Sequence, residues 1–266
     1  MKIKVLYEDS NILAIDKPSG ISVHGDGRSK DKTIADWIFK NYPKMKNVGE
    51  MQVFENKKIK VEIPKPGIVH RLDNETSGVM LLAKNEKAYQ FLKKQFQDRV
   101  VKKIYVAIVD GWIKDDRGLI KKPIGRSPSD FRKYSSSRGA RGEMRDALTQ
   151  YKVLKRFEKK AKPCEIFSRF TLKGSDTAKK SHKVLLHKFT YVELSPKTGR
   201  THQIRVHMKF IDHPVVCDSL YNPKGSCPKI ISRMGLHAKS IEFKDLKGKT
   251  IKVESNIPLE FKKMVK

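Results

Sequence analysis

The sequence has no run of about 18 apolar residues, the length that a membrane-spanning helix requires. Its first residues reach Glu8 and Asp9 before an apolar segment of the secretory kind could form. We therefore expect a chain without a membrane partner that works in the cytoplasm.

Cysteine is scarce, with only Cys164, Cys217 and Cys227 in 266 residues. An odd number without a Cys-x-x-Cys pair argues against a disulfide framework and against structural zinc, so we expect three reduced thiols. The eight histidines contain no His-Glu-x-x-His motif, which predicts that no metal is bound. Phosphate-binding loops of the Gly-x-x-x-x-Gly-Lys-Ser/Thr kind and Gly-x-Ser-x-Gly elbows are also missing, so nothing indicates nucleotide-driven or serine acyl-transfer chemistry.

Acidic residues are half as numerous as basic ones, with 29 Asp and Glu against 58 Lys and Arg and a formal charge of +29. Such an excess is typical of proteins that bind a polyanion, and RNA, DNA and an anionic membrane all fit it. A lysine-rich, merely solvated surface is the alternative. With 38% hydrophobic residues, no internal repeat and no Pro- or Ser-rich linker, we expect one globular domain over residues 1–266.

Strand patterns outnumber helical ones, and no regular alternation of strand and helix is visible. The class is therefore predicted as α+β, with a mixed, largely antiparallel sheet flanked by helices. Thr33 and Asn85 are expected to cap the first two helices. Strands are expected at 3–9, 11–17, 20–25, 79–84, 102–113, 150–157, 164–172, 187–196, 237–243 and 250–255, and helices at 33–42, 85–96, 201–211 and 259–264.

Two segments are polar and basic. Residues 115–148 are rich in Arg, Ser and Gly and are expected to form a long loop, either facing RNA or simply covering the surface. Residues 157–187 are long and rich in lysine, without an assigned role.

Asp73 is the acid that stands out in this basic chain, because it lies two residues after Arg71 and three residues before a Thr-Ser-Gly turn. A nearby guanidinium favours the ionised carboxylate, which suits a nucleophile or a base better than a proton donor. The alternative is an Asp that only accepts backbone N–H groups in its own turn. No second carboxylate has comparable neighbours in the sequence, which argues against a hydrolase that uses a pair of acids.

Three segments together resemble the RluA-type pseudouridine synthases. They are HRLDNETSG at 70–78, KIYVAIVDG at 103–111 and GRTHQIRVHM at 199–208. Flanking stretches at 5–24, 123–126 and 235–243 are similar to the same family and follow in the same order.

The resemblance implies an enzyme that cuts the C–N glycosidic bond of a uridine in RNA, turns the base and rejoins it through carbon, without a cofactor. Asp73 would be the nucleophile, at the ribose C1′ or the uracil C6. Arg205 would pair with Asp73, unless it is a surface arginine of an amphipathic helix. Tyr105 would stack on the flipped uracil and assist proton removal at C5, unless it is only a buried strand tyrosine.

Other motif residues are assigned to binding. Arg71 would brace the RNA after the uridine leaves the stack, or would contact a phosphate. His70 is placed beside Asp73, and Leu236 and His237 would line the uracil pocket. His202, Gln203 and His207 are expected to orient the helix rather than to act in the chemistry.

The implied partner is ribosomal or transfer RNA, and the enzyme is expected to be a monomer. We expect no N-terminal S4-like domain of the kind that other members often carry, because the stretch that resembles the catalytic opening begins near Val5. Departures occur where the family has Gly-His-Pro and Gly-Asp, since this chain has Asp212-His213-Pro214 and Cys217-Asp218. A non-catalytic RNA-binding or ribosome-assembly factor with the same fold is the main alternative, and a generic DNA- or membrane-surface protein is a weaker one.

Overall fold

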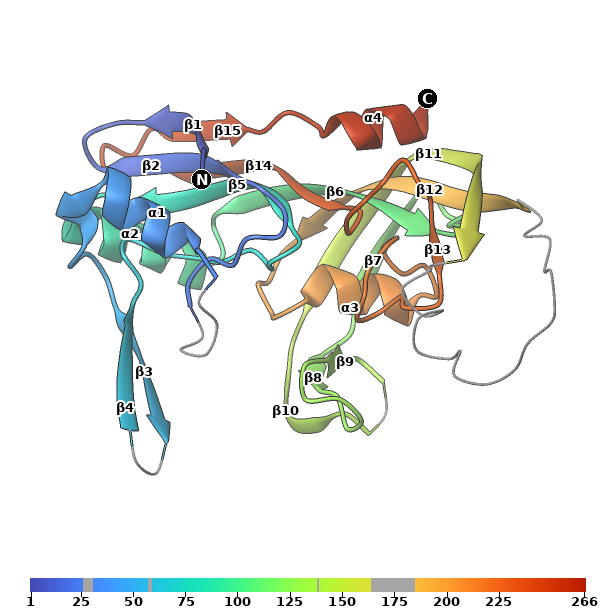
Figure 1. Cartoon of the computed structure of the whole chain (residues 1–266), viewed down its shortest axis with the longest axis horizontal. Coiled ribbons are helices and arrows are strands. Elements are labelled where there is room, and N and C mark those ends of the chain that lie inside the picture. The colour runs from blue at the N-terminus through green and yellow to red at the C-terminus, as the bar shows by residue number, and fades with distance from the viewer. Residues whose placement is uncertain (26–30, 57–58, 138, 164–184) are drawn as a thin grey trace. The chain divides into compact units, whose positions relative to one another are not determined.

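The computed structural model describes residues 1–25, 31–56, 59–137, 139–163 and 185–266 (Figure 1). Two compact units divide the chain, and each combines strands with helices, as the α+β prediction requires. Unit 1 consists of Met1–Lys103 and Ala238–Asn256, and unit 2 consists of Ile104–His237 and Ile257–Lys266.

The sheet of unit 1 has the strand order β1-β2-β5-β14, with β15 paired to β14. The pairs β1–β2, β2–β5 and β14–β15 are antiparallel. All residues of β5 and most of β2 are buried, which explains why both strands appear in the sequence as nearly continuous apolar runs. These strands are β1 (Lys4–Glu8), β2 (Ile12–Lys17), β5 (Ser77–Ala83), β14 (Leu236–Lys244) and β15 (Thr250–Glu254).

Both helices of unit 1 begin at the expected caps. The amide of Asp36 donates to the Thr33 hydroxyl at 3.3 Å, and the amide of Ala88 donates to the Asn85 side chain at 2.9 Å. These bonds satisfy amides that have no partner inside a helix, so the boundaries follow from local chemistry. The elements are α1 (Ile34–Asn41), the short 3-10 helix η1 (Pro43–Met45) and α2 (Glu86–Gln97).

The strand predicted at residues 20–25 is wrong. The carbonyls of Ser22 and Val23 accept bonds from the amides of Ile34 and Ala35, both at 3.0 Å. This segment is therefore bonded to the start of α1 and not to the sheet.

An unpredicted hairpin completes unit 1. Its strands, β3 (Met51–Asn56) and β4 (Ile59–Pro64), pair antiparallel. Figure 1 shows this hairpin extending away from the sheet of unit 1.

Unit 2 is built on antiparallel strands in the order β6-β12-β11, with β7 and β13 also paired to β11. Ala107 and Val109 of β6 pack with Val192 and Leu194 of β12 in a core that also takes up Met208. The predicted helix after Thr201 is confirmed as α3. The elements are β6 (Lys102–Asp110), β7 (Arg117–Lys121), β11 (Leu148–Pro163), β12 (Leu185–Pro196), α3 (Gln203–Phe210), β13 (Ser226–Cys227) and α4 (Leu259–Val265).

Residues 115–148 contain regular structure where the sequence predicts a loop. Besides β7, the segment forms a small three-stranded sheet in the order β10-β8-β9. Ile124 and Ala147 are buried against Val206 of α3 and Tyr221, which anchors this sheet to unit 2. Too few apolar residues lie in the strands β8 (Ile124–Arg126), β9 (Tyr134–Ser135) and β10 (Arg141–Arg145) for a pattern to be visible. The strand predicted at 164–172 lies outside the described residues.

Candidate functional site

Asp73 lies in the loop that leads into β5 and is half-buried. Its carbonyl accepts a bond from the Thr76 amide at 3.1 Å, which closes a turn directly before the strand. Leu72, one residue earlier, is only 5% exposed and fixes the loop to the core. The backbone at Asp73 is therefore held between an anchored residue and a closed turn.

Lys17, which sequence reasoning missed, ties this loop to the end of β2. The side chain is fully buried, and Nζ donates to the carbonyls of Pro18, Ile21 and Asn74 at 2.9, 2.7 and 2.9 Å. The Ser19 hydroxyl donates to the next carbonyl along, that of Glu75, at 2.6 Å. A buried ammonium is tolerated only where its donors are satisfied, so Lys17 holds the residues after Asp73 in one position. In the sequence, the Lys-Pro-Ser-Gly stretch at 17–20 is the signal from which Lys17 could have been identified.

His70 faces the interior of unit 1. Its Nε2 accepts the Leu81 amide at 2.9 Å, and its ring stacks on Phe96 with 4.6 Å between centroids. Burial, assisted by the charge of Lys103, lowers the pKa of His70 to about 3. The imidazole is therefore neutral at pH 7, and its Nε2 is occupied by the backbone. Arg71, the next residue, is exposed.

Arg205 is buried on α3, with 3% exposure, so it is not the surface arginine of the alternative reading. Nε and one terminal nitrogen donate to the two carboxylate oxygens of Asp218 at 2.7 and 2.8 Å. The guanidinium also lies 5.0 Å from the ring centroid of Tyr221. This fork geometry fixes the orientation of Arg205. Its expected pairing with Asp73 remains a prediction.

Asp218 is the second residue that the sequence did not reveal. It is fully buried and also accepts the amides of Leu220 and Tyr221, both at 3.0 Å. These amides hold the carboxylate where Arg205 needs it. In the sequence, Asp218 could have been identified as an acidic residue shortly after the third motif, in the Cys217-Asp218 pair.

Tyr105 and the two late residues lie in unit 2. Tyr105 is on β6, opposite Leu194, and is half-buried against the core. Leu236 and His237 are buried, with 3% and 2% exposure, and the His237 ring meets Phe261 edge-on. Their roles toward a uracil remain predictions.

The polar residues of the third motif bond to unit 2 itself. Gln203 donates to the carbonyl of Leu148 at 3.0 Å and to the hydroxyl of Thr149 at 2.9 Å. The two ring nitrogens of His207 lie 2.8 Å from the Thr149 hydroxyl and 2.9 Å from the Lys122 carbonyl. These contacts fix α3 against β11 and against the segment that follows β7, as expected for residues that orient the helix.

The departures from the family pattern share one backbone feature. Asp212 and Cys217 have φ angles of +62° and +54°, in the left-handed region that favours glycine. Glycine is thus the residue that these turns accommodate most readily.

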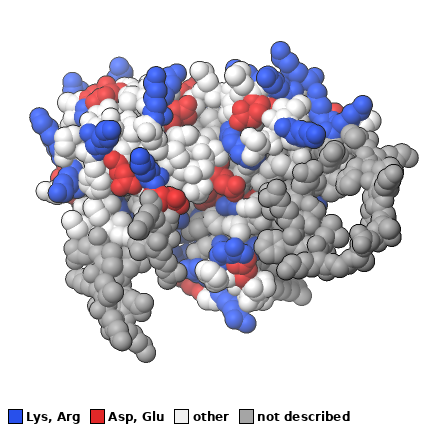
Figure 2. Space-filling view, in the orientation of Figure 1, with Lys and Arg blue, Asp and Glu red and all other residues white. Residues whose placement is uncertain are grey.

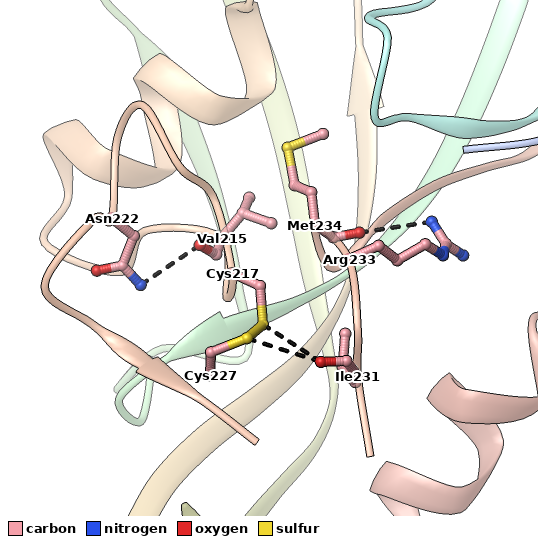
Figure 3. The surroundings of a disulfide bond; sticks show 7 residues. All are labelled: Val215, Cys217, Asn222, Cys227, Ile231, Arg233 and Met234. Atoms are coloured by element: carbon pink, nitrogen blue, oxygen red, sulfur yellow. Dashed lines mark hydrogen bonds between the residues drawn. A yellow bond between two sulfur atoms is a disulfide. The ribbon is translucent and has the colours of Figure 1, made fainter. Parts of the chain in front are cut away.

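The expectation of three reduced cysteines is wrong for two of them. Cys217 and Cys227 form a disulfide, with 5.0 Å between their Cα atoms and a separation of ten positions in the sequence. Figure 3 shows both sulfur atoms beside the carbonyl of Ile231. An odd number of cysteines excludes a complete framework but not one bridge across a single loop.

Among the described residues, no group of three or more His, Cys, Asp or Glu side chains could hold a metal ion. Within the same residues, no helix is long and apolar enough to cross a bilayer.

The model of one protein family, described as RNA pseudouridylate synthase, matches residues 11–210. An uncharacterized RNA pseudouridine synthase of Aquifex aeolicus is 35% identical over 88% of this chain and 61% of its own length. The ribosomal large subunit pseudouridine synthase D of Borreliella burgdorferi is 33% identical over 97% of this chain and 66% of its own. The chain therefore spans less than two thirds of these two relatives.

A solved structure shares the fold. Human RNA pseudouridylate synthase domain containing 1 aligns with a TM-score of 0.64 at 22% identity, over 97% of this chain and 84% of the human one.

Proposed function

Because this chain belongs to the RNA pseudouridylate synthase family, we propose that it converts uridine in RNA to pseudouridine. The observation that carries the proposal is the extent of the family match, which includes Asp73, Tyr105 and Arg205 in their three motifs. A factor that had kept only the fold would have no need for all three.

In this proposal Asp73 is the nucleophile, attacking the ribose C1′ or the uracil C6. The C–N bond breaks, the uracil turns, and a C–C bond forms from C5 to the ribose. The bond from Asp73 to C1′ or C6 breaks again, which returns the free carboxylate, and C5 loses its proton while N1 takes one up. Either route needs an ionised carboxylate held in place. The buried Lys17 supports this role, because it fixes the residues that follow Asp73.

Arg205 is assigned the task of keeping Asp73 ionised and oriented. The support is its own rigidity, since Asp218 binds it through two hydrogen bonds inside unit 2. Tyr105 is assigned to stack on the uracil and to assist in removing the C5 proton, for which a half-buried phenol at the start of β6 is suited.

Uridine within a stem or loop must be turned out of the stack before an enzyme can reach it, at a cost of about a few kcal/mol. We assign Arg71 to occupy the place of the lost base or to contact the backbone, because it is exposed and charged. His70 is assigned a place beside Asp73, and Leu236 and His237 are assigned to line the uracil pocket.

Ribosomal RNA of the large subunit is the substrate class that we propose first, because several relatives are named large-subunit pseudouridine synthase D. Transfer RNA is the second. We further propose that the enzyme works in the cytoplasm as a monomer and needs no metal or cofactor.

Tritium release from RNA labelled at uracil C5 tests the activity, with ribosomal and transfer RNA transcripts as separate substrates. The wild type should release tritium from at least one pool and the Asp73→Asn protein from neither. RNA binding without release would favour the assembly-factor alternative.

A further inference from the structure

A positive pocket lies in unit 2 between the small sheet and the segment that precedes α3. It has a volume of about 300 Å³, near the lower end for small-ligand sites. Its walls come from β8, β9, β10 and the motif that leads into α3. The lining residues that matter here are Arg126, Tyr134, Glu143, Arg145 and Arg200.

The charge of this pocket is not cancelled. Glu143 accepts from Arg145, with 2.8 Å between their nearest atoms, so these two neutralise each other. Within the described part of the chain, Arg126 and Arg200 have no carboxylate partner. Each donates instead to a backbone carbonyl at 3.1 Å, Arg126 to Phe131 and Arg200 to Asp146. Two positive charges thus remain.

Both arginines make contacts within unit 2 that do not consume their charge. The Arg126 guanidinium lies 5.1 Å from the ring centroid of Tyr134, and the Tyr134 amide donates to the Tyr221 hydroxyl at 2.9 Å. Each carbonyl contact occupies one side of a guanidinium that carries five N–H donors. The remaining donors suit an oxyanion, which arginine binds through parallel hydrogen bonds.

We propose that this pocket binds a backbone phosphate of the RNA substrate. The ligand class follows from two uncompensated guanidiniums in a cavity too small for a folded segment. Arg200 precedes Arg205 by five residues on one continuous segment, so a phosphate held here would lie at a fixed separation from Arg205. The inference that this phosphate belongs to RNA rests on the proposed function.

The total charge of the chain does not locate such a contact. Figure 2 shows Lys and Arg side chains spread over one face, with Asp and Glu between them. A defined pocket is therefore a stronger indication than the net charge.

Salt-dependent binding of a short single-stranded RNA oligonucleotide to the full chain tests the proposal. Arg126→Gln and Arg200→Gln should each weaken binding about tenfold and make the slope of log K against log salt shallower by about 0.7, the value for one lost phosphate contact. Arg117→Gln removes the same charge from an exposed position of unit 2 outside this pocket and should leave the slope unchanged. Equal effects of all three variants, or no effect of the pocket variants, would overturn the proposal.

Arg200→Lys serves as a second variant, because it keeps the positive charge but loses the guanidinium that can donate two parallel hydrogen bonds. It should weaken binding while the salt slope stays close to that of the wild type. A wild-type affinity for Arg200→Lys would contradict bidentate binding and overturn this part of the assignment.

Nuclear magnetic resonance of the arginine Nε–H groups separates RNA from free phosphate compounds. The RNA oligonucleotide should shift the Arg126 and Arg200 signals at concentrations where inorganic phosphate and uridine monophosphate leave them unmoved. Shifts caused by inorganic phosphate or uridine monophosphate at concentrations where the RNA oligonucleotide causes none would assign the pocket to a free phosphate compound. That result would overturn the RNA assignment. Binding does not require turnover, so a wild type without tritium release would remove the proposed isomerase activity while these measurements still decide the pocket.

Discussion

Asp218 holds Arg205 through two buried hydrogen bonds of 2.7 and 2.8 Å, with the arginine side chain 4% exposed and the aspartate side chain fully buried. The acid sits in a turn of its own, where two backbone amides fix it. Two charges of opposite sign thus satisfy each other inside unit 2, and the family's third-motif arginine has a defined direction.

Replacing Asp218 by Asn should leave the Arg205 charge buried without its full partner. We expect the free energy of unfolding to fall by about 3 kcal/mol. Catalytic turnover should fall as well, because Arg205 loses its orientation. Urea denaturation of Asp218→Asn measures the first effect, with Glu158→Gln as an exposed control. A variant as stable as the wild type would contradict the account of this pair.

Lys17→Met should remove the donor that three carbonyls share. The expected loss is about 3 kcal/mol of unfolding free energy, since buried acceptors then lack a partner. Lys102→Met is the matched control, because Lys102 is 72% exposed and its ion pair with Glu242 is worth at most about 1 kcal/mol. Similar stability losses in the two variants would argue against a positioning role for Lys17.

The pH dependence of stability should report on His70. Its folded pKa of about 3 lies below the ordinary value of 6.5, so between these values the unfolded chain binds more protons than the folded one. Stability should therefore fall as the pH drops from 6.5 toward 3, by up to about 1.4 kcal/mol per pH unit. His70→Gln can accept the same amide without titrating and should show a shallower slope. An unchanged slope would mean that other groups cause the acid sensitivity.

Reduction of the Cys217–Cys227 disulfide should destabilise the protein. A bridge that closes a loop of this length restricts the unfolded chain and so raises the free energy of unfolding by about 3 kcal/mol. Cys227→Ser should lose this stability and no longer respond to a reducing agent in thermal unfolding. Cys164→Ser should behave as the wild type. A reductant-insensitive wild type would contradict the bridge.

Local signals explain what the sequence predicted correctly. Thr33 and Asn85 satisfy helix amides within three residues, so the starts of α1 and α2 depend on nearby residues alone. The apolar runs of β2 and β5 likewise follow from burial in the middle of a sheet.

Contacts between distant residues explain what the sequence did not predict. Ser22 and Val23 look like part of a strand, but their carbonyls bond to α1. The bridge between Cys217 and Cys227 depends on the path of the chain between them, which no spacing motif encodes. Asp218 and Lys17 act through partners that can be identified only once the chain is folded.

The proposed function depends on the formation of pseudouridine in RNA by means of Asp73. Single-turnover incubation of a ribosomal RNA transcript with excess enzyme, followed by digestion and chromatographic separation of the nucleosides, tests it most directly. We expect pseudouridine with the wild type and none above the enzyme-free level with Asp73→Asn at matched RNA binding. Pseudouridine formed by Asp73→Asn at a rate near that of the wild type would contradict it.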